Sequence, residues 1–402
     1  MPLLQPLPTI AGWTGLAAAA GYAVAAVTAV VADALRRARP GAAPSAAPPR
    51  AGAVQAPVTL LKPLCGAEPG LYEHLRSFCR QDYPQYQIVF GVRDPADPAL
   101  PVVARLVREF PALPIEVVVD PRLHGSNLKV SNLINMLARA RHDLLVVADS
   151  DTWVEPAYLA AVTGPLADAE VGLVNCLYTD VPTAGIWSRL GAMYINDWYM
   201  PSVLLAQLLG YQGYVSGQTL CLRRGTLVAA GGLEAIADHL ADDNRLGELV
   251  RGLGLRIACS PYRVRAQHDE PDLRTLLRHE SRWMGTVRVL RPHSFRFLFL
   301  SFSLPLALLG LLGLLVPALH GARGPIPPAA WTLFGIALGA RLLLHLAARA
   351  GSGLRLCTDL WLVPLRDALL VGVWCRCFFT TRVTWRGADF AVAADGVMRR
   401  LS

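Results

Sequence analysis

The sequence has little charge, few lysines and no pair of cysteines at the spacing of a zinc site. Charged residues make up 17% of the 402 residues, whereas the hydrophobic set AVILMFWYC makes up 53%. This composition excludes a disordered chain and argues against a wholly soluble protein. The length excludes a small scaffold held together by disulfides, and it suffices for one sizeable core with additional segments.

The positive charge consists almost entirely of arginine. The net charge is +8, but only two of the basic residues are lysines, and the arginines are spread along the chain. Nucleic-acid binding requires clustered basic residues, so we expect no nucleic acid among the partners. We interpret the excess of arginine as a signal of membrane topology.

Long uncharged stretches predict membrane-spanning segments. Residues 1–32 carry no charge, and residues 10–31 are long enough to cross a hydrocarbon core of ~30 Å at ~1.5 Å per residue. Arginines follow this stretch, whereas a cleaved signal peptide has its positive charge before the apolar segment. The positive-inside rule then places the N-terminus outside and the residues from Gly41 onward in the cytoplasm.

The C-terminal part holds three more apolar stretches. Residues 297–319 are uncharged and rich in leucine, and they form the clearest of these stretches. Residues 329–348 contain one arginine, whereas residues 356–379 contain four charged side chains. Three spans in total would leave the basic C-terminus in the cytoplasm, so we favour a re-entrant or surface-lying segment over a fourth span.

Residues 57–290 have the pattern of an α/β domain. Short apolar runs alternate with helical stretches, which is typical of a mostly parallel sheet that is covered on both faces. The runs are 58–61, 87–92, 115–119, 144–148 and 171–175. In such sheets the ligand binds beyond the carboxyl ends of the strands, so residues at these ends are the first candidates for a site.

Acidic residues follow two of these runs. Asp94 comes after the run at 87–92, and Asp149 and Asp151 follow the run at 144–148. Two carboxylates at a sheet edge offer hard oxygen ligands that can hold Mg²⁺ or Mn²⁺ against a substrate diphosphate. The alternative is that this pair caps a helix that begins near Pro156. The position of these acids at strand ends favours the metal site.

Two further candidates belong to the same domain. Lys129 lies at a predicted helix start, where a cation and backbone N–H groups suit an anionic ligand, although a solvated surface lysine has the same pattern. Asp242 and Asp243 precede a helical stretch and are either helix caps or functional acids.

A predicted helix that leads into the membrane region carries His279, Arg282 and Trp283. His279 and Arg282 share a helix face, so both are able to meet a ligand, and an interfacial anchor made of Arg and Trp is the alternative. Aromatic residues precede this helix at Tyr194, Trp198, Tyr199, Tyr211 and Tyr214. They predict an interfacial surface, with an ordinary buried helix and strand as the alternative.

Nine motifs occur together, and in the same order, in a known family. They are Leu61-Lys-Pro-Leu-Cys-Gly66, Asp82-Tyr-Pro84, Val92-Arg-Asp-Pro-Ala-Asp-Pro98, Lys129-Val-Ser-Asn-Leu133, Asp149-Ser-Asp151, Val215-Ser-Gly-Gln-Thr219, Gly231-Gly-Leu, Asp242-Asp243 and His279-x-x-Arg-Trp283. The sequence resembles the ceramide glucosyltransferases in these motifs, and it is most similar to their bacterial relatives, the hopanoid-biosynthesis-associated glycosyltransferases. The resemblance covers residues 57 to about 290 and extends loosely to 383–387.

The resemblance implies a GT-A fold, an inverting mechanism and a UDP-linked sugar donor. The implied roles are nucleotide recognition by Asp94, contact with the uridine diphosphate by Lys129, binding of the metal and the diphosphate by Asp149 and Asp151, proton abstraction by Asp243, and closure over donor and acceptor by Arg282 and Trp283. Two positions depart from the family pattern. The eukaryotic enzymes have glycine where Asp151 stands, and His279 stands where they have Gln or Arg, which leaves its role open.

We therefore expect a membrane-anchored inverting glycosyltransferase that moves one sugar, glucose or N-acetylglucosamine, from a UDP-sugar to a lipid hydroxyl. The acceptor is hopanoid (bacteriohopanetetrol-type) or ceramide-like. The expected parts are a transmembrane helix at 1–38, a linker at 39–56, a cytoplasmic GT-A catalytic domain at 57–290, a membrane region at 291–380 and a basic tail at 381–402. The expected location is the bacterial inner membrane, with several spans. The alternatives are a processive polysaccharide synthase and a non-catalytic membrane transporter or scaffold.

Overall fold

The computed structural model describes residues 7–38, 55–319, 325–380, 382–385, 388–393 and 395–401. The chain forms two compact units, and each unit combines several stretches of the sequence. The sheet unit comprises Arg37–Thr183, Tyr211–Asp269 and Arg382–Ser402, and the helical unit comprises Met1–Arg36, Ala184–Gly210 and Glu270–Thr381. Most of the predicted linker, residues 39–54, lies outside the described residues. The predicted domains are continuous in sequence whereas these units interleave, and the predicted boundaries stay a prediction.

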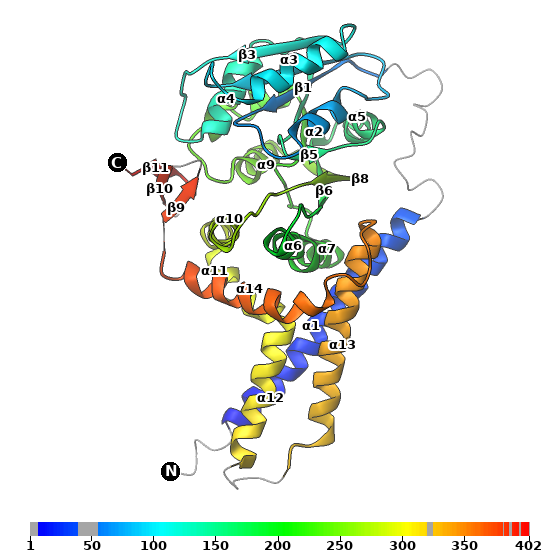
Figure 1. The fold of residues 1–402 in the computed structure, drawn as a ribbon, viewed down its shortest axis with the longest axis vertical. Coiled ribbons are helices and arrows are strands. Elements are labelled where there is room, and N and C mark those ends of the chain that lie inside the picture. The colour runs from blue at the N-terminus through cyan, green and yellow to red at the C-terminus, as the bar shows by residue number, and fades with distance from the viewer. Residues whose placement is uncertain are drawn as a thin grey trace. The chain divides into compact units, whose positions relative to one another are not determined.

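The sheet unit is built on an eight-stranded sheet (Figure 1). Its strands are β1 (Val58–Pro63), β2 (Tyr86–Val92), β3 (Ile115–Val119), β4 (Leu144–Val147), β5 (Thr152–Trp153), β6 (Val171–Asp180), β7 (Leu220–Arg223) and β8 (Arg256–Ala266), in the spatial order β3-β2-β1-β4-β7-β6-β8-β5. β3, β2, β1 and β4 run parallel to one another, and β6 runs parallel to β8. β7 is antiparallel to both of its neighbours, and β5 is antiparallel to β8. The predicted α/β class with a mostly parallel sheet is confirmed.

Helices cover both faces of this sheet. They are α2 (Leu71–Phe78), α3 (Ala99–Glu109), α4 (Leu128–Leu137), α5 (Tyr158–Thr163), η1 (Gly164–Ala167), α8 (Arg224–Ala229), η3 (Glu234–Ile236) and α9 (Asp242–Gly252). On one face, Leu133 of α4 and Leu246 of α9 join a core that includes Leu61 of β1. Successive side chains of a strand point to opposite faces, so Lys62 faces the other side, where its Nζ lies 3.7 Å from the centre of the Phe78 ring on α2.

The residues that were predicted to be a basic tail form a second, small sheet. Its strands are β9 (Arg382–Trp385), β10 (Ala388–Val392) and β11 (Met398–Arg400), and they pair antiparallel. Phe390 and Met398 pack against Leu240, and the backbone N–H of Met398 donates to the backbone oxygen of Asp238 at 2.7 Å. The small sheet therefore holds the segment that leads into α9.

The described part of the helical unit contains three long apolar helices and a set of other elements. The apolar helices are α1 (Leu7–Ala38), α12 (Ser303–Leu319) and α13 (Pro328–Gly351). The other elements are α6 (Ile186–Met193), the π-helical turn η2 (Tyr194–Tyr199), α7 (Met200–Leu208), α10 (Leu273–Leu290), α11 (Pro292–Arg296), η4 (Leu298–Ser301), η5 (Leu360–Leu362) and α14 (Val363–Cys377).

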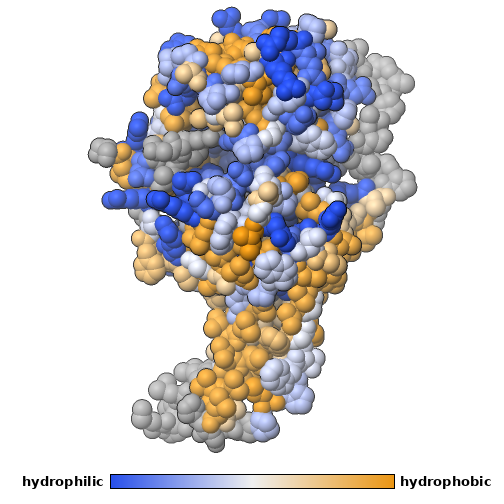
Figure 2. All heavy atoms as spheres, in the orientation of Figure 1, coloured by the Kyte–Doolittle hydropathy of each residue, from blue (hydrophilic) through white to orange (hydrophobic). Residues whose placement is uncertain are grey.

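The three long helices pack closely and expose apolar side chains. A Cβ atom added at Gly310 of α12 would lie 2.8 Å from the backbone oxygen of Gly12 of α1, so glycine permits the close approach of these helices. Close approach through small residues is typical of helices that associate in membranes. On the outside, Leu309 is 65% exposed and Leu312 is 51% exposed. Figure 2 shows hydrophobic side chains over the visible face of these helices.

Among the residues that the structure describes, two helices are long and apolar enough to cross a bilayer. They are the stretch Thr9–Ala38, with a mean hydropathy of 1.9, and Pro328–Gly351, with a mean hydropathy of 1.5. The predicted span at 297–319 needs correction, because α12 begins at Ser303 and the residues before it form the short turn η4. Pro305 explains the later start, since proline is tolerated in the first turn of a helix but interrupts its interior.

The segment at 356–379 does not form a long helix. Its helical part, α14, has 15 residues and so measures about 22 Å, which is less than the ~30 Å of a hydrocarbon core. α14 runs across the direction of α1, α12 and α13 in Figure 1. This geometry suits a surface-lying segment, and the number of spans and the orientation in a membrane stay predictions.

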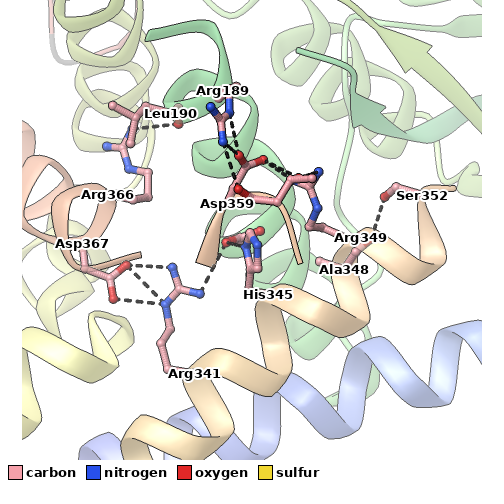
Figure 3. A network of polar contacts seen from close by, with 12 residues as sticks. Arg189, Leu190, Arg341, His345, Ala348, Arg349, Ser352, Asp359, Arg366 and Asp367 are labelled. Carbon is pink, nitrogen blue, oxygen red and sulfur yellow. Dashed lines mark hydrogen bonds and ion pairs between the residues drawn. The ribbon is translucent and has the colours of Figure 1, made fainter. Parts of the chain in front are cut away.

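Buried ion pairs connect α6, η2, α13 and α14 (Figure 3). Arg341 of α13 donates to Asp367 of α14 at 2.9 Å and lies 3.4 Å from Asp197 of η2. His345 Nδ1 lies 2.7 Å from the same Asp197 carboxylate, and Asp359 pairs with both Arg189 and Arg349. Charges buried in this way require partners, so the network fixes how these segments pack.

A second buried pair joins α14 to α10. Arg366 is 1% exposed and Glu280 is 0% exposed, and Arg366 Nη2 donates to Glu280 Oε2 at 2.7 Å while Nη1 donates to the other carboxylate oxygen. Burial raises the pKa of Glu280, and the guanidinium of Arg366 opposes this effect. The pair therefore keeps a carboxylate inside the helical unit.

Loss of Arg366 alone should destabilise the helical unit. Arg366→Met leaves the Glu280 charge buried without a cation, which is expected to cost roughly 3–5 kcal/mol. The double variant Arg366→Met/Glu280→Gln removes both charges and should recover most of this loss. Thermal unfolding of the full chain in detergent measures the difference, and a double variant as unstable as the single one would contradict the expectation.

Candidate functional site

The start of α4 places Lys129. The side-chain oxygen of Asn127 accepts hydrogen bonds from the backbone N–H groups of Lys129 at 3.0 Å and Val130 at 3.1 Å, which is the arrangement of a helix cap. Asn127 also donates through Nδ2 to the backbone oxygen of His239 at 2.8 Å. This second bond ties the start of α4 to the segment that leads into α9, so it brings Lys129 close to the acids at the start of α9.

The end of β4 places Asp149. The backbone oxygen of Asp149 accepts a hydrogen bond from Nζ of Lys62, which also lies 3.3 Å from Thr152 Oγ1. Burial lowers the pKa of Lys62 to about 7, against the opposing effect of Asp149 and Asp151. Sequence reasoning missed Lys62, although it is one of only two lysines and follows directly on an apolar run.

Three predicted site residues converge on Gly217. A Cβ atom added at Gly217 would lie 3.3 Å from Lys129 Nζ, 3.4 Å from Asp243 Oδ2 and 3.7 Å from Asp149 Oδ2. Lys129 Nζ makes a salt bridge of 2.5 Å with Asp149 Oδ1 and lies 3.8 Å from Asp242 Oδ2. A cation and two carboxylates therefore face one another at the carboxyl edge of the parallel strands.

The acids of this cluster are not helix caps. α5 begins at Tyr158 without a side-chain cap, so Asp149 and Asp151 do not serve it. α9 also begins without a side-chain cap, although Asp242 and Asp243 lie in its first turn. None of these acids is therefore the N-cap of α5 or α9. Within the first turn of α9, Asp243 Oδ1 accepts a hydrogen bond from the backbone N–H of Asn244 at 2.7 Å, whereas its Oδ2 faces Gly217.

The cluster changes the acidity of its members. Burial raises the pKa of Asp243 to about 6, with a contribution from Asp242, while Lys129 opposes the shift. Burial alone would lower the pKa of Lys129, but Asp149 and Asp242 outweigh burial and raise it above its ordinary value. Asp243 is thus mostly ionised near neutral pH, with a pKa close enough to accept a proton in a reaction.

Asp151 lies beside a histidine at the same edge. His268 Nε2 lies 3.3 Å from Asp151 Oδ2, and His268 Nδ1 lies 3.1 Å from Asp180 Oδ2 at the end of β6. Burial raises the pKa of Asp151 to about 6, and Asp149 adds to this while His268 opposes it. His268 and Asp180 were not predicted, because nothing in their local sequence distinguishes them.

The donor set at this edge fits a divalent cation bound together with substrate. Asp151 Oδ1 is buried and has no hydrogen-bond partner among the described residues, and the Asp149 carboxylate is close by in sequence and offers further hard oxygen ligands. The described residues contain no group of three or more His, Cys, Asp or Glu side chains that could hold a metal ion alone. Mg²⁺ in particular is commonly bound by one or two carboxylates plus substrate phosphates, so a small protein ligand set is compatible with it.

Asp94 lies at the same edge of the sheet but is exposed. It follows β2, which is parallel to β1, and its carboxylate accepts a hydrogen bond from the backbone N–H of Ala96 at 2.8 Å. None of its described contacts involves the cluster around Gly217. Its predicted contact with a nucleotide stays a prediction.

Crowding at Gly217 gives a direct test of the cluster. Gly217→Ala would push a methyl group between Lys129, Asp149 and Asp243, and small misplacements of catalytic groups can cost up to ~10²-fold in rate. We expect kcat for sugar transfer to fall by about 10-fold to 100-fold with little change in unfolding temperature. Gly225→Ala is the matched control, because an added Cβ there meets nothing within 4 Å. Equal activity of the two variants would contradict the convergence.

His279, Arg282 and Trp283 belong to α10 of the helical unit. His279 Nδ1 lies 2.7 Å from Glu270 Oε1, and the ring of Trp283 lies 6.1 Å from the His279 ring and 5.7 Å from the Tyr194 ring. The guanidinium of Arg282 lies 5.8 Å from the centre of the Trp283 ring, so the three residues lie together on α10. Their approach to the acids of the sheet unit stays a prediction.

The predicted aromatic surface needs correction for two of its residues. Tyr194 is 2% exposed and Trp198 is 7% exposed, so both are buried in the helical unit. The indole N–H of Trp198 donates to Ser301 Oγ at 2.9 Å, and Tyr194 packs against Trp283. Their role is to pack the helical unit, because a ring that is almost fully buried cannot anchor at an interface.

Comparison with known proteins supports the family that the sequence motifs indicate. A model of glycosyl transferase family 21 matches residues 16–398. Ceramide glucosyltransferase 1 of Caenorhabditis elegans is 22% identical over 237 residues, which is 59% of this chain and 51% of that protein. The ceramide glucosyltransferase of Candida albicans is 32% identical over 108 residues, which is 24% of this chain and 20% of that protein. The chain thus spans about half the length, or less, of these curated relatives.

A solved structure confirms the fold. A mannosyltransferase from Pyrobaculum calidifontis, in complex with GDP-Man and Mn²⁺, matches with a TM-score of 0.54 at 19% identity, over 92% of this chain and 99% of that chain. The family model covers nearly the whole described chain, including the residues that meet at Gly217. The chain therefore belongs to glycosyl transferase family 21 and has the GT-A fold.

Proposed function

We propose that the protein is a membrane-anchored inverting glycosyltransferase that moves one sugar from a UDP-sugar to a lipid hydroxyl. The observation that carries this proposal is the meeting of Lys129, Asp149 and Asp243 at Gly217, in a chain of family 21. A cation and acids at the carboxyl edge of the sheet are the groups that departure of a nucleoside diphosphate and activation of a hydroxyl require.

The leaving group needs positive charge. Breaking the sugar–phosphate bond builds negative charge on the diphosphate, and Lys129, which is held at the start of α4, can stabilise it together with the backbone N–H groups there. A divalent cation, Mg²⁺ or Mn²⁺, held by Asp149 and Asp151 would supply further charge stabilisation worth several kcal/mol. Asp94 is the proposed contact to the nucleotide.

The acceptor hydroxyl needs a base. A carboxylate that takes its proton accelerates the attack by ~10²-fold to 10⁴-fold, and Asp243 is the proposed base because its pKa of about 6 lies close to a working pH. The hydroxyl attacks from the face opposite the diphosphate, so an α-linked donor gives a β-linked product without a covalent enzyme intermediate. His279, Arg282 and Trp283 are proposed to close over donor and acceptor.

The acceptor is proposed to be a lipid alcohol in a membrane. The apolar helices α1 and α13 are long enough to span, and relatives of this chain are named ceramide glucosyltransferases. Ceramide-like and hopanoid acceptors both present a hydroxyl at the end of a large apolar body, and glucose and N-acetylglucosamine are the candidate sugars. The proposed location is a bacterial inner membrane, with several spans and the sheet unit in the cytoplasm.

One experiment tests donor and acceptor together. The full chain in lipid nanodiscs is incubated with UDP-glucose or UDP-N-acetylglucosamine and with ceramide or bacteriohopanetetrol, and the lipids are analysed by mass spectrometry. We expect one lipid to gain the mass of a single hexose or N-acetylhexosamine. Addition of many sugars would instead indicate a processive synthase, and no UDP release with any combination would refute the proposal.

A further inference from the structure

Glu270 is a buried carboxylate outside the cluster of acids in the sheet unit. It is 1% exposed, and its Oε1 lies 2.7 Å from Nδ1 of His279. Its second oxygen, Oε2, is buried and has no hydrogen-bond partner among the described residues. The imidazole of His279 is therefore the one hydrogen-bond partner that the described chain offers this carboxylate.

The chain holds Glu270 in a fixed place. Asp272, two residues further on, caps α10 by accepting a hydrogen bond from the backbone N–H of Thr275 at 2.7 Å. On the other side, a Cβ added at Gly191 of α6 would lie 3.2 Å from Cγ and 3.9 Å from Oε1 of Glu270. The carboxylate is thus confined between α6 and the start of α10.

Glu280 is a buried carboxylate close to Glu270 in the sequence, but it is paired with a guanidinium. Glu280 lies one position after His279, and it is neutralised by two hydrogen bonds from Arg366. No described Lys or Arg side chain makes a salt bridge with Glu270. A carboxylate that served only packing would be better replaced by an apolar side chain, because burying a charge without a cation is unfavourable. The pairing with His279 is what Glu270 provides.

The opposite end of the imidazole is available to a ligand. The buried face of α10 consists of Leu276, Glu280 and Met284, which follow one another at intervals of four. His279 lies beside this face, and its side chain is 32% exposed. The tautomer that donates Nδ1–H to the carboxylate is the one in which Nε2 presents a lone pair to a ligand. Trp283, one turn further along, packs against the same ring.

We infer that Glu270 is a positioning residue that holds His279 so that Nε2 accepts a hydrogen bond from a polar group of the lipid acceptor next to the hydroxyl that receives the sugar. The inference rests on the proposed function. Glu270 and His279 belong to the same unit as the apolar helices α1 and α13, where a lipid alcohol would be received. The pair orients the lipid, and the proton of the reacting hydroxyl is left to the proposed base, Asp243.

A double-variant cycle tests this inference with the full chain in nanodiscs. Glu270→Gln, His279→Gln and the double variant are compared in kcat and KM for the lipid alcohol that the wild-type protein uses, and in affinity for UDP. We expect Glu270→Gln to lower kcat/KM for the lipid by about 10-fold to 100-fold while UDP affinity stays within about twofold. In the His279→Gln background, Glu270→Gln should cause no further loss, because glutamine has no tautomer to fix.

The controls separate positioning from folding. Asp272→Asn keeps a capping residue next to the pair and should leave the kinetics unchanged. Glu270→Asp keeps the charge and should lose less activity than Glu270→Gln. Gly191→Ala displaces Glu270 without changing any charge, and it should lower kcat/KM for the lipid even if Glu270→Gln does not fold. The inference would be overturned if Glu270→Gln caused equal losses in the wild-type and His279→Gln backgrounds. Unchanged kinetics in Glu270→Gln or in Gly191→Ala would also overturn it. A wild-type protein that glycosylates no lipid would instead refute the proposed function itself.

Discussion

Asp243→Asn is expected to lower kcat for sugar transfer by ~10²-fold to 10⁴-fold, because an amide cannot take the proton of the acceptor hydroxyl. The variant keeps the shape of the side chain, so the site around Gly217 should stay intact and UDP should still bind. Single-turnover transfer from a labelled UDP-sugar measures the rate, and calorimetry measures UDP binding. Normal turnover in this variant would remove Asp243 as the base.

The pH dependence of the wild-type protein provides a second readout of the same group. A base must be deprotonated, and the pKa of Asp243 is raised to about 6, so kcat/KM should fall as the pH drops through about 6. Asp242→Asn is the matched control. Asp242 raises the pKa of Asp243, so its removal should move the fall in kcat/KM to lower pH while transfer at neutral pH persists. If Asp242→Asn abolished transfer and Asp243→Asn did not, the two roles would be exchanged.

The sequence predicted the part of the fold that apolar runs encode. The five runs proposed as strands became β1, β2, β3, β4 and β6. β1, β2, β4 and β6 are largely buried, and strands buried on both faces must be apolar along their length. β3 is apolar as well, although it lies at the edge of the sheet and is partly exposed. β8 was missed for the converse reason. Its exposed positions include Arg256 and Arg265, so polar and apolar residues alternate along it and it has no continuous apolar run. β7 was missed because its apolar run is only three residues long, from Leu220 to Leu222, whereas the run that predicted β4 extends over 144–148.

The candidate site was predictable where a strand end or a helix start marks it. Asp149 follows β4 and Lys129 lies in the first turn of α4, and both positions are visible in the sequence. Asp243 was predicted by its motif, but its meeting with Asp149 depends on the hydrogen bonds of Asn127 to the segment before α9. Such contacts between distant segments leave no periodic signal.

Residues that act through partners were the hardest to predict. Lys62 contacts the backbone of Asp149, and Glu270 contacts His279, and neither contact follows from spacing along the chain. In the helical unit, the span predicted at 297–319 ignored Pro305, which a hydropathy average does not register. Charged residues such as Arg366 lowered the apolar signal of α14, because sequence alone does not show that Glu280 neutralises this charge.

Asp149→Ala is expected to abolish the part of UDP affinity that depends on a divalent cation. The carboxylate of Asp149 is proposed to hold the cation with Asp151, and its loss should weaken UDP binding in the presence of Mn²⁺ by ~10²-fold, because charge stabilisation of this kind is worth several kcal/mol. UDP titrations with Mn²⁺ and with EDTA measure the two components. Asp168→Ala is the matched control, since it removes a carboxylate of the same unit that pairs with Arg256 on the surface.

Lys129→Ala distinguishes the contribution of the divalent cation to UDP binding from that of the lysine. Lys129 makes a salt bridge with Asp149, so Asp149→Ala alone changes both the metal ligand and the partner of the lysine. Lys129 acts on the diphosphate by its own charge, and its loss should therefore weaken UDP binding by a similar factor with Mn²⁺ and with EDTA. Asp149→Ala should instead remove the difference between the two titrations. Equal dependence on Mn²⁺ in wild type and Asp149→Ala would show that Asp149 only neutralises Lys129, and the cation would then have to be held by other groups.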